Sequence, residues 1–444
     1  MTIFALSTGS NKSGIAIIRI SGPDTKRALG KLTKIKLPNP REAKICKIYN
    51  PENNELLDQG MLLWFPGPNS YTGEDLAEFH IHGSNAVVSA LLSSLSKIEN
   101  CRLAEPGEFS KIAFENGKIN LLNIEALSDL ISSETELQRK QAINLLSGKV
   151  SKKYRELRER LIKILANVEA KIDFPEEDLP KDILKNIKDE TENIINIIKS
   201  ILDDNKTGEK IRNGFKIVIV GPTNAGKSSL LNYLSKREVA IVSDIEGTTR
   251  DTLEVSLNLD GYPVIISDTA GLRESNDKIE QKGVQIALDR AQNADLKIIL
   301  LDAKSPEFKG FFDYLYDDNT LIVLNKADLV SNNFKDNRIS TLDHILISVK
   351  EETNINILVE EIKKKLKKKF VVNENILISR QRHRLNLEEC ISHLNNFLEN
   401  NSINEFDKAA EDLRLATRYL GRVVGDVDVE EVLEKIFDDF CIGK

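Results

Sequence analysis

Three short motifs in the middle of the chain carry residue types that together bind a nucleotide. The first is Gly221-Pro-Thr-Asn-Ala-Gly-Lys-Ser228, which fits the pattern G-x-x-x-x-G-K-[ST]. In such a loop the backbone N–H groups face the phosphates, the lysine reaches the β- and γ-phosphate oxygens, and the last hydroxyl ligates Mg²⁺. An apolar run at 215–220 precedes the loop and helical apolar spacing at 228–234 follows it. Strand, loop and helix are therefore in the order that phosphate binding requires.

The second and third motifs indicate that the nucleotide is GTP. Asp268-Thr-Ala-Gly271 and Asn325-Lys-Ala-Asp328 each follow a further apolar run. The carboxylate of Asp328 can accept hydrogen bonds from both the ring N–H and the exocyclic amine of guanine. Adenine lacks that pair of donors, and a site built for a hydrogen bond rejects an analogue that cannot make it. The segment Ser348-Val-Lys350 follows another apolar run and is predicted to contact the base.

The hydrolytic machinery lacks a residue that small GTPases usually have. They place Gln directly after Asp-x-x-Gly to orient the attacking water, whereas this chain has Leu272. Asn224, inside the phosphate loop, could ligate a monovalent cation or could only stabilise the loop, and we favour the cation. The segment 243–250 resembles a first switch, in which Thr249 is the candidate for a second Mg²⁺ contact. Asp268 is the candidate for a water-mediated contact with the metal.

Length and composition indicate a multidomain globular protein. The chain has 444 residues, 41% hydrophobic and 30% charged, which predicts two or three domains. The formal net charge of −7 means that any RNA contact must be local. The sequence has no signal peptide and no long apolar stretch, so we expect a cytoplasmic protein without membrane contact. Four scattered cysteines argue against a zinc site or a disulfide framework: Cys46, Cys101, Cys390 and Cys441.

Local patterns predict a mixed α/β segment at the start of the chain. Residues 14–20 and 60–65 are apolar runs bounded by Gly and Pro, which predicts strands, and 85–97 has helical spacing. From about residue 117 the apolar stripes predict helices at 125–146 and 150–172, the second ended by Asp173-Phe-Pro175.

Strands and helices alternate in the GTP-binding region, as in a parallel α/β sheet. Alternating Leu253, Val255, Leu257 and Leu259 followed by Asp260-Gly261 predict a hairpin and hence one antiparallel edge.

We therefore predict an α/β and α fold in four segments. Residues 1–116 form an N-terminal α/β domain, and 213–370 form an inserted Ras-like P-loop GTPase domain. Residues 117–212 and 371–444 pack together as one discontinuous helical domain.

Two basic runs leave an RNA contact open. The lysines of 363–369 are either an RNA patch or the solvated face of the last GTPase helix, and the second is favoured. Arg380-Gln-Arg-His-Arg384 opens the second helical segment and could contact tRNA, but that role is not favoured.

The order of these features, together with the last four residues, closely resembles the tRNA modification GTPase MnmE (TrmE) family over essentially the whole chain. The specific motifs are Arg19-Ile-Ser-Gly22, Trp64-Phe-Pro-Gly-Pro-Asn69, Tyr71-Thr-Gly-Glu-Asp75, Pro106-Gly-Glu-Phe109, Ala170-Lys-Ile-Asp-Phe-Pro175, Gly247-Thr-Thr-Arg-Asp251 and Phe440-Cys-Ile-Gly-Lys444.

The resemblance implies that the N-terminal domain binds a tetrahydrofolate one-carbon donor, either 5-formyl- or 5,10-methylene-tetrahydrofolate. Arg19, Glu78 and Lys118 match the folate-contacting positions of the family. Lys444 and Cys441 match residues close to that site, and the resemblance makes Cys441 a candidate participant in the modification chemistry.

For the GTPase, the resemblance implies that Glu280 positions the hydrolytic water in place of the missing Gln. It assigns K⁺ ligation to Asn224, Ser243, Ile245 and Thr248, while Mg²⁺ falls to Ser228 and Thr249. The full set of GTP-binding candidates is Asn224, Ala225, Gly226, Lys227, Ser228, Ser229, Ser243, Asp244, Ile245, Glu246, Gly247, Thr248, Thr249, Asp268, Thr269, Ala270, Gly271, Asn325, Lys326, Asp328, Ser348, Val349 and Lys350.

The resemblance also implies partners and a reaction. Family members form homodimers through their N-terminal domains and work in a heterotetramer with the flavoprotein MnmG (GidA), which carries FAD and uses NADH. The pair installs a carboxymethylaminomethyl or aminomethyl group at C5 of the wobble uridine U34 of tRNA, with K⁺-stimulated GTP hydrolysis. The alternatives are an RNA-binding switch for ribosome assembly and a folate enzyme with a regulatory GTPase lobe.

Overall fold

A computed structural model describes residues 1–173, 183–237, 254–268, 289–304, 315–330, 342–369, 376–399, 406–427 and 443. The chain divides into two compact units, each built from separate stretches of sequence. One unit contains 1–128, 148–183 and 392–444, and the other contains 129–147 and 184–391. Within the described ranges, no helix is long and apolar enough to cross a membrane.

The N-terminal part of the first unit is a six-stranded sheet in the order β3-β4-β5-β2-β1-β6. Only the β1–β6 pair is parallel. The predicted strands at 14–20 and 60–65 are confirmed, each slightly longer than expected. The strands are β1 (Thr2–Leu6), β2 (Ser13–Ser21), β3 (Lys44–Tyr49), β4 (Leu56–Phe65), β5 (Leu76–Gly83) and β6 (Cys101–Leu103).

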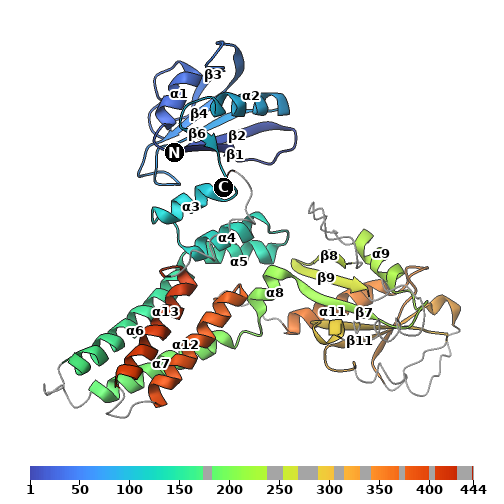
Figure 1. Cartoon of the computed structure of the whole chain (residues 1–444). Coiled ribbons are helices and arrows are strands. Elements are labelled where there is room, and N and C mark those ends of the chain that lie inside the picture. Colours follow the sequence, from blue (N-terminus) through green and yellow to red (C-terminus); the bar gives the residue numbers. More distant parts are fainter. Residues whose placement is uncertain are drawn as a thin grey trace, which may run out of the picture. The chain divides into compact units, whose positions relative to one another are not determined.

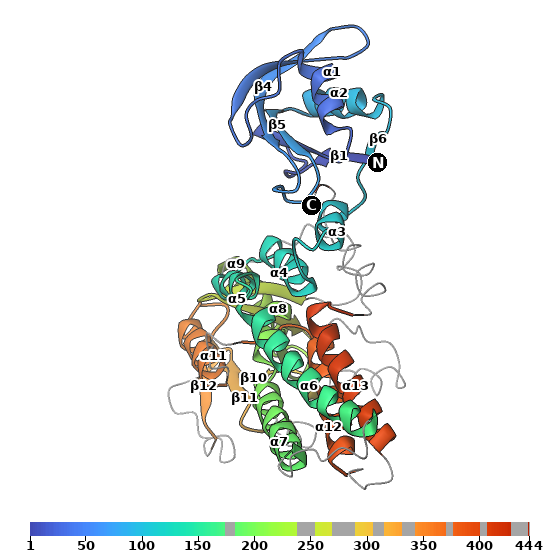
Figure 2. The same cartoon turned by 90° about the vertical axis from the view of Figure 1, so that its left-hand side faces the viewer.

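Helices cover both faces of this sheet. α1 (Thr25–Thr33) and α2 (Asn85–Ser96) pack on one face around Ile18, Phe79 and Leu95, and Figure 2 shows them together on that side. α3 (Glu108–Glu115) covers part of the other face, where Phe109 packs against Ile3 and Ala5. Alternation of side chains along a strand thus gives two cores, one on each face.

The helices that follow correct one prediction. The helix predicted at 125–146 is two helices, α4 (Leu121–Ile131) and α5 (Glu136–Leu146). Thr135 and Gln138 form a capping box that starts α5, because their side chains satisfy backbone N–H groups that the helix leaves free. This local signal overrides the continuous apolar stripe.

The helices after α5 include a packed pair in the first unit. α6 (Lys149–Asp173) packs against α13 (Phe406–Val424) in the first unit, as Figure 1 shows. It confirms the helix predicted at 150–172, whereas Phe174 and Pro175 of the predicted break lie outside the described residues. Within the described ranges the remaining helices are α7 (Ile183–Leu202), α8 (Thr207–Asn213), α9 (Lys227–Arg237), the 3₁₀ turn η3 (Ala327–Leu329), α11 (Ile355–Lys369) and α12 (Gln381–Glu399).

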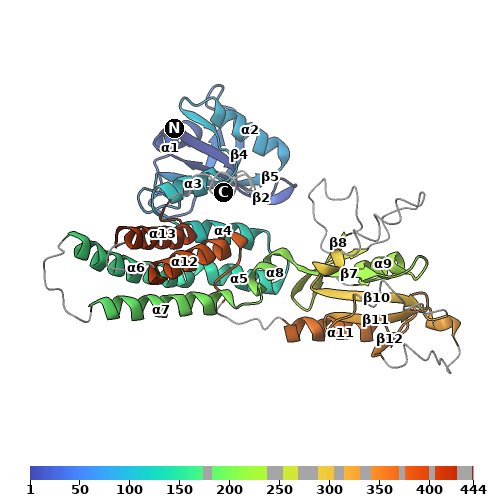
Figure 3. The ribbon, with the colours of Figure 1, turned by 60° about the horizontal axis from the view of Figure 1, so that its bottom comes forward.

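The second unit contains a second six-stranded sheet in the order β12-β11-β10-β7-β9-β8, whose strands run side by side in Figure 3. Among the described strands of this sheet, the one antiparallel pair is the predicted hairpin with its turn at Asp260-Gly261, so that prediction is confirmed. The strands are β7 (Phe215–Val220), β8 (Glu254–Leu259), β9 (Tyr262–Asp268), β10 (Leu296–Asp302), β11 (Thr320–Asn325) and β12 (His344–Leu346). The predicted mixed α/β and α fold class is confirmed.

Candidate functional site

The phosphate loop lies where the strand order of the second sheet reverses. β7 lies between β10 and β9, so the chain leaves β7 at a switch point, where open α/β sheets bind ligands beyond the carboxyl ends of their strands. Residues 221–226 link β7 to α9, which begins at Lys227. The start of a helix presents free backbone N–H groups and the positive end of its dipole, which favours phosphate.

Backbone geometry explains the glycine at the end of this loop. Gly226 has φ +97°, and a Cβ there would collide with the carboxamide of Asn325. Lys227 is 7% exposed, and its ammonium donates to the carbonyl oxygens of Gly221 and Pro222, each at 2.9 Å. Asn224 has φ 65° and an exposed side chain. The loop is thus held by its own lysine, while the Asn224 side chain faces solvent.

The Asn-Lys-Ala-Asp motif joins three loops. Asn325 is 3% exposed; its amide nitrogen donates to the carbonyl oxygen of Ala225 at 2.8 Å, and its oxygen accepts from the backbone N–H of Val349 at 3.1 Å. Ser348 Oγ donates to Asp328 Oδ1 at 2.6 Å. The phosphate loop, η3 and the loop after β12 are therefore connected by hydrogen bonds to side chains that sequence motifs singled out.

Asp268 ends β9 beside Ile219 of β7, so its backbone lies at the same edge of the sheet as the phosphate loop. Several other predicted site residues lie outside the described residues: Ser243, Asp244, Ile245, Glu246, Gly247, Thr248, Thr249, Thr269, Ala270, Gly271, Glu280, Cys441 and Lys444. Within the described ranges no cluster of three or more His, Cys, Asp or Glu could hold a metal ion.

A second group of predicted residues lies on the N-terminal sheet. Arg19 on β2 and Glu78 on β5 are directly opposite each other, and Nη2 of Arg19 lies 2.8 Å from Oε1 of Glu78. The guanidinium also lies over the rings of Tyr71 and Phe109, 5.4 and 5.7 Å from their centroids. Cation–π contacts of this kind hold the Arg19 guanidinium in place. Arg19 and Glu78, which the sequence analysis treated as separate candidates, therefore form one ion pair.

Lys118 lies beside the loop that carries Tyr71. Asn116 Nδ2 donates to the carbonyl oxygen of Thr72 at 2.7 Å, and a Cβ added at Gly73 would lie 3.1 Å from Lys118 Cε. The structure therefore places Arg19, Glu78 and Lys118 around one loop.

Sequence reasoning missed His80, which is on the same face of β5 as Glu78 because side chains alternate along a strand. His80 Nε2 is buried, has no hydrogen-bond partner in the described part of the chain, and lies 3.7 Å from Glu78 Oε2. Two-residue spacing on one strand was the signal that could have found it.

The penultimate residue of the chain lies against the same sheet. Gly443 is buried, and its carbonyl oxygen accepts a hydrogen bond from Ser7 Oγ at 2.9 Å. The backbone N–H of Ser7 in turn donates to Ile17 of β2 at 2.7 Å. Gly443 is therefore tied, through Ser7, to the strand that carries Arg19.

The run 380–384 has partners inside the second unit. Arg380 Nη2 lies 2.7 Å from Asp129 Oδ1, and Arg384 Nη2 lies 2.9 Å from Glu209 Oε2 and 2.5 Å from Asp204. Burial opposes the charge of Arg384, but hydrogen bonds to Glu209 and Asp204 raise its pKa above the ordinary value. Arg380 and Arg384 therefore have a structural role.

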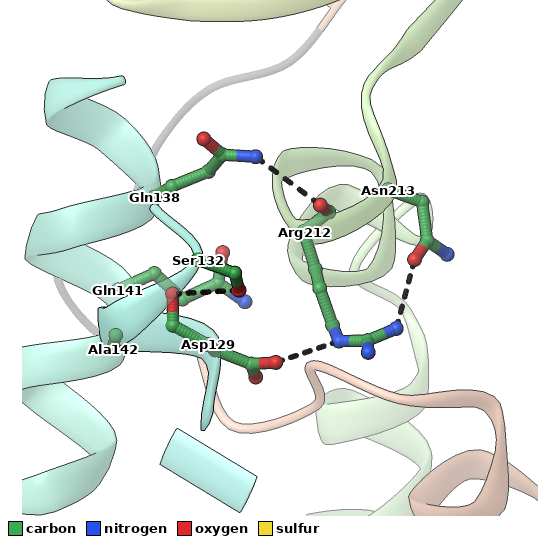
Figure 4. Close-up of a pocket in the computed structure, with 7 residues that line it drawn as sticks. All are labelled: Asp129, Ser132, Gln138, Gln141, Ala142, Arg212 and Asn213. Atoms are coloured by element: carbon green, nitrogen blue, oxygen red, sulfur yellow. Dashed lines mark hydrogen bonds and ion pairs between the residues drawn. The ribbon is translucent and has the colours of Figure 1, made fainter. Parts of the chain in front are cut away.

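Asp129 also faces a polar cavity of about 130 Å³ between α5 and α8. Asp129 Oδ1 lies 2.8 Å from Arg212 Nε, and Gln138 Nε2 donates to the carbonyl oxygen of Arg212 at 3.2 Å (Figure 4). Gln141 donates to Gly208, and its amide oxygen has no hydrogen-bond partner in the described residues. A cavity of this size and polarity suits ordered water. The hydrogen bonds of its lining residues Asp129, Gln138 and Gln141 hold α8, which leads directly into β7.

Loss of the ion pairs of Arg384 should lower the free energy of unfolding of the second unit. Arg384→Ala leaves Glu209 and Asp204 without their cation, and Glu209 is 9% exposed. Breaking a buried pair by removing one partner costs about 3–5 kcal/mol. Urea unfolding followed by circular dichroism should show this loss. The matched control is Arg139→Ala, which breaks the exposed pair with Glu136 and should leave the unfolding midpoint nearly unchanged. Equal losses of stability in the two variants would contradict the structural role.

Comparison with known proteins adds to this geometry. The family profile described as "GTP-binding protein TrmE N-terminus" matches residues 2–118, and the one described as "MnmE helical domain" matches 121–441. A "tRNA modification GTPase MnmE" from Pelagibacter ubique (strain HTCC1062) is 61% identical over 444 residues, covering 100% of both chains. The chain belongs to the MnmE (TrmE) family. A relative of the same name from Parvibaculum lavamentivorans is 45% identical, again covering 100% of both chains.

Membership of this family makes the chain a GTP hydrolase, as the phosphate loop and the Asn-Lys-Ala-Asp motif predicted. Solved structures with partial similarity include an Aquifex aeolicus Era variant bound to GDP and AlF₄⁻, at 22% identity with a TM-score of 0.27. The aligned region covers 42% of this chain and 68% of the Era chain. The G domain of the T. maritima FeoB iron transporter covers 34% and 98%, at 23% identity with a TM-score of 0.26.

Proposed function

We propose that this GTPase acts with a flavoprotein partner, MnmG (GidA), to modify C5 of the wobble uridine U34 in tRNA. The product is a carboxymethylaminomethyl or aminomethyl group, and the one-carbon donor is a tetrahydrofolate. The observation that carries this proposal is 61% identity over the full length of a relative named as a tRNA modification GTPase. Mass spectrometry of tRNA nucleosides from a strain lacking this gene tests it. Unmodified U34 that the gene restores is the expected result, and normal U34 modification would overturn it.

The proposed domains are 1–116 for folate and dimerisation, 117–212 with 371–444 as the helical domain, and 213–370 for GTP. The separate family matches at 2–118 and 121–441 support the first boundary. A cytoplasmic homodimer that binds tRNA and its flavoprotein partner is part of the proposal.

The described geometry fits a folate at the N-terminal sheet. Glu78 uses Oε1 for both contacts with Arg19, so Oε2 can accept a hydrogen bond from an N–H of the pterin ring. Lys118 is exposed and can pair with a carboxylate of the folate tail. When bound, the folate supplies the carbon that is transferred; the proposed tasks of Arg19, Glu78, Lys118 and Lys444 are to bind and orient it.

The phosphate loop fits GTP with Mg²⁺ and K⁺. Backbone N–H groups at the start of α9 and the Lys227 ammonium would hold the phosphates, and Ser228 and Thr249 would hold Mg²⁺. The exposed Asn224 side chain offers an oxygen for K⁺, with Ser243, Ile245 and Thr248 as the proposed further ligands. Glu280 is proposed to orient the attacking water, since Leu272 has no hydrogen-bonding group.

Hydrolysis should therefore be faster in K⁺ than in Na⁺ at equal ionic strength. Asn224→Ala should abolish this difference in rate, because it removes the side-chain oxygen that is proposed to ligate K⁺. The backbone φ of 65° at this position is one that Asn adopts more readily than most residues. Glu280→Ala should bind GTP normally and turn it over about a hundredfold more slowly, as expected for loss of a group that acts in the transition state. Steady-state phosphate release measures both effects. Equal rates of GTP hydrolysis by the wild type in K⁺ and in Na⁺ would contradict the proposed cation site.

A further inference from the structure

Asp302 is the last residue of β10, and none of the nucleotide-binding motifs includes it. It lies beside Asn325 in the parallel β10–β11 register, and its Oδ2 accepts from Lys326 Nζ at 2.6 Å. Its other oxygen accepts from the backbone N–H of Lys304 at 2.9 Å. Burial acts to raise the pKa of Asp302, but the hydrogen bonds from Lys326 and Lys304 hold it below the ordinary value. Asp302 is therefore an ionised partner of the lysine inside the Asn-Lys-Ala-Asp motif.

This pairing matters because of the carboxylate two residues further on. A lysine carries a compact ammonium on a flexible four-carbon stem, so Lys326 could otherwise turn toward Asp328. That contact would occupy the acceptor that reads guanine. Instead Asp302 holds Lys326, while Ser348 Oγ holds Asp328 at 2.6 Å. The two charges of the motif thus have separate partners.

We propose that Asp302 is a positioning residue of the guanine pocket. It anchors the Lys326 ammonium so that the methylene stem lies as an apolar surface for the base, and it leaves Asp328 as an open acceptor. The inference rests on the proposed assignment of the base pocket to Asn325, Lys326 and Asp328.

Dissociation of a fluorescent GDP analogue from the full-length protein tests this role, together with affinities for GTP and ITP, whose base lacks the exocyclic amine. Asp302→Ala should speed dissociation about fivefold to tenfold, as expected for loss of a partly exposed, charge-assisted hydrogen bond. It should also narrow the preference for GTP over ITP, a change that loss of stability alone would not cause. Asp302→Asn keeps an acceptor and should restore part of both properties.

Asp317→Ala is the matched control. Asp317 Oδ2 lies 2.7 Å from Lys297 Nζ, between the same two strands but at their opposite ends. This variant should keep wild-type dissociation and the wild-type GTP to ITP ratio.

Lys326→Ala distinguishes an error in the base-pocket assignment from an error in the positioning role of Asp302. If it leaves dissociation unchanged, the base-pocket assignment is wrong and the inference falls with it. If Lys326→Ala speeds dissociation while Asp302→Ala behaves as wild type, the pocket stands and the positioning role of Asp302 is wrong.

Discussion

Asp328→Asn should change the base that this GTPase prefers from guanine to xanthine. Asp328 lies in η3, where the backbone N–H of Ala327 donates to the carbonyl oxygen of Ile347 at 3.0 Å and Ser348 fixes one carboxylate oxygen. An amide in that place presents a donor where guanine also presents donors, whereas xanthine presents a carbonyl. Loss of two charge-assisted hydrogen bonds should weaken GTP binding about a hundredfold, with tighter binding of xanthosine triphosphate.

Equilibrium titration with both nucleotides measures this change. The control is Asp343→Asn, the same substitution at an exposed position just before β12, at the other end of that strand. It should leave both affinities unchanged. Unchanged GTP affinity in Asp328→Asn, with no gain for xanthosine triphosphate, would refute the base-pocket assignment.

The sequence predicted which residues form the nucleotide-binding region because phosphate and guanine recognition each demand a short, contiguous pattern. It did not predict the contacts between the motifs. Asn325 reaches Ala225 across one hundred residues, and Asp302 reaches Lys326 only because β10 and β11 are parallel neighbours in one register. Such contacts depend on strand order, which no local pattern contains.

The N-terminal sheet illustrates the same limit. The strands of Arg19 and Glu78 were predictable from their apolar runs, but a lone Arg or Glu on a strand is usually a solvated charge. Their pairing follows from the antiparallel β2–β5 register, which brings together residues 59 positions apart. In α4 and α5 the failure had another cause, since apolar periodicity continued across a break that the capping box of Thr135 and Gln138 creates.

Deletion of residues 441–444 should abolish tRNA modification while GTP hydrolysis continues. The nucleotide loops belong to the second unit, and the tail belongs to the first. Gly443 is bound through Ser7, which is tied to β2, so the deletion removes this contact together with Cys441 and Lys444, the candidates for the chemistry and for folate binding. Cys441→Ser tests the thiol separately, because serine nearly keeps the volume and is a far weaker nucleophile near neutral pH. Modification of U34 in a reconstituted reaction with the flavoprotein, scored beside GTP turnover, measures both; full modification without the tail would show that this terminus has no such role.

Gly443→Val tests whether the position of the tail, and not only its presence, is required. Gly443 has φ +103°, which L side chains rarely adopt, and a Cβ there would collide with the carbonyl oxygen of Leu6. Valine should therefore displace the tail and cause nearly the same loss of modification as the deletion, although Cys441 and Lys444 remain in the chain. Gly9→Val is the control, since a Cβ at Gly9 meets no atom within 4 Å. If Gly443→Val modifies tRNA as fast as Gly9→Val, the anchoring of Gly443 on Ser7 is not what brings the C-terminal residues to the proposed folate site.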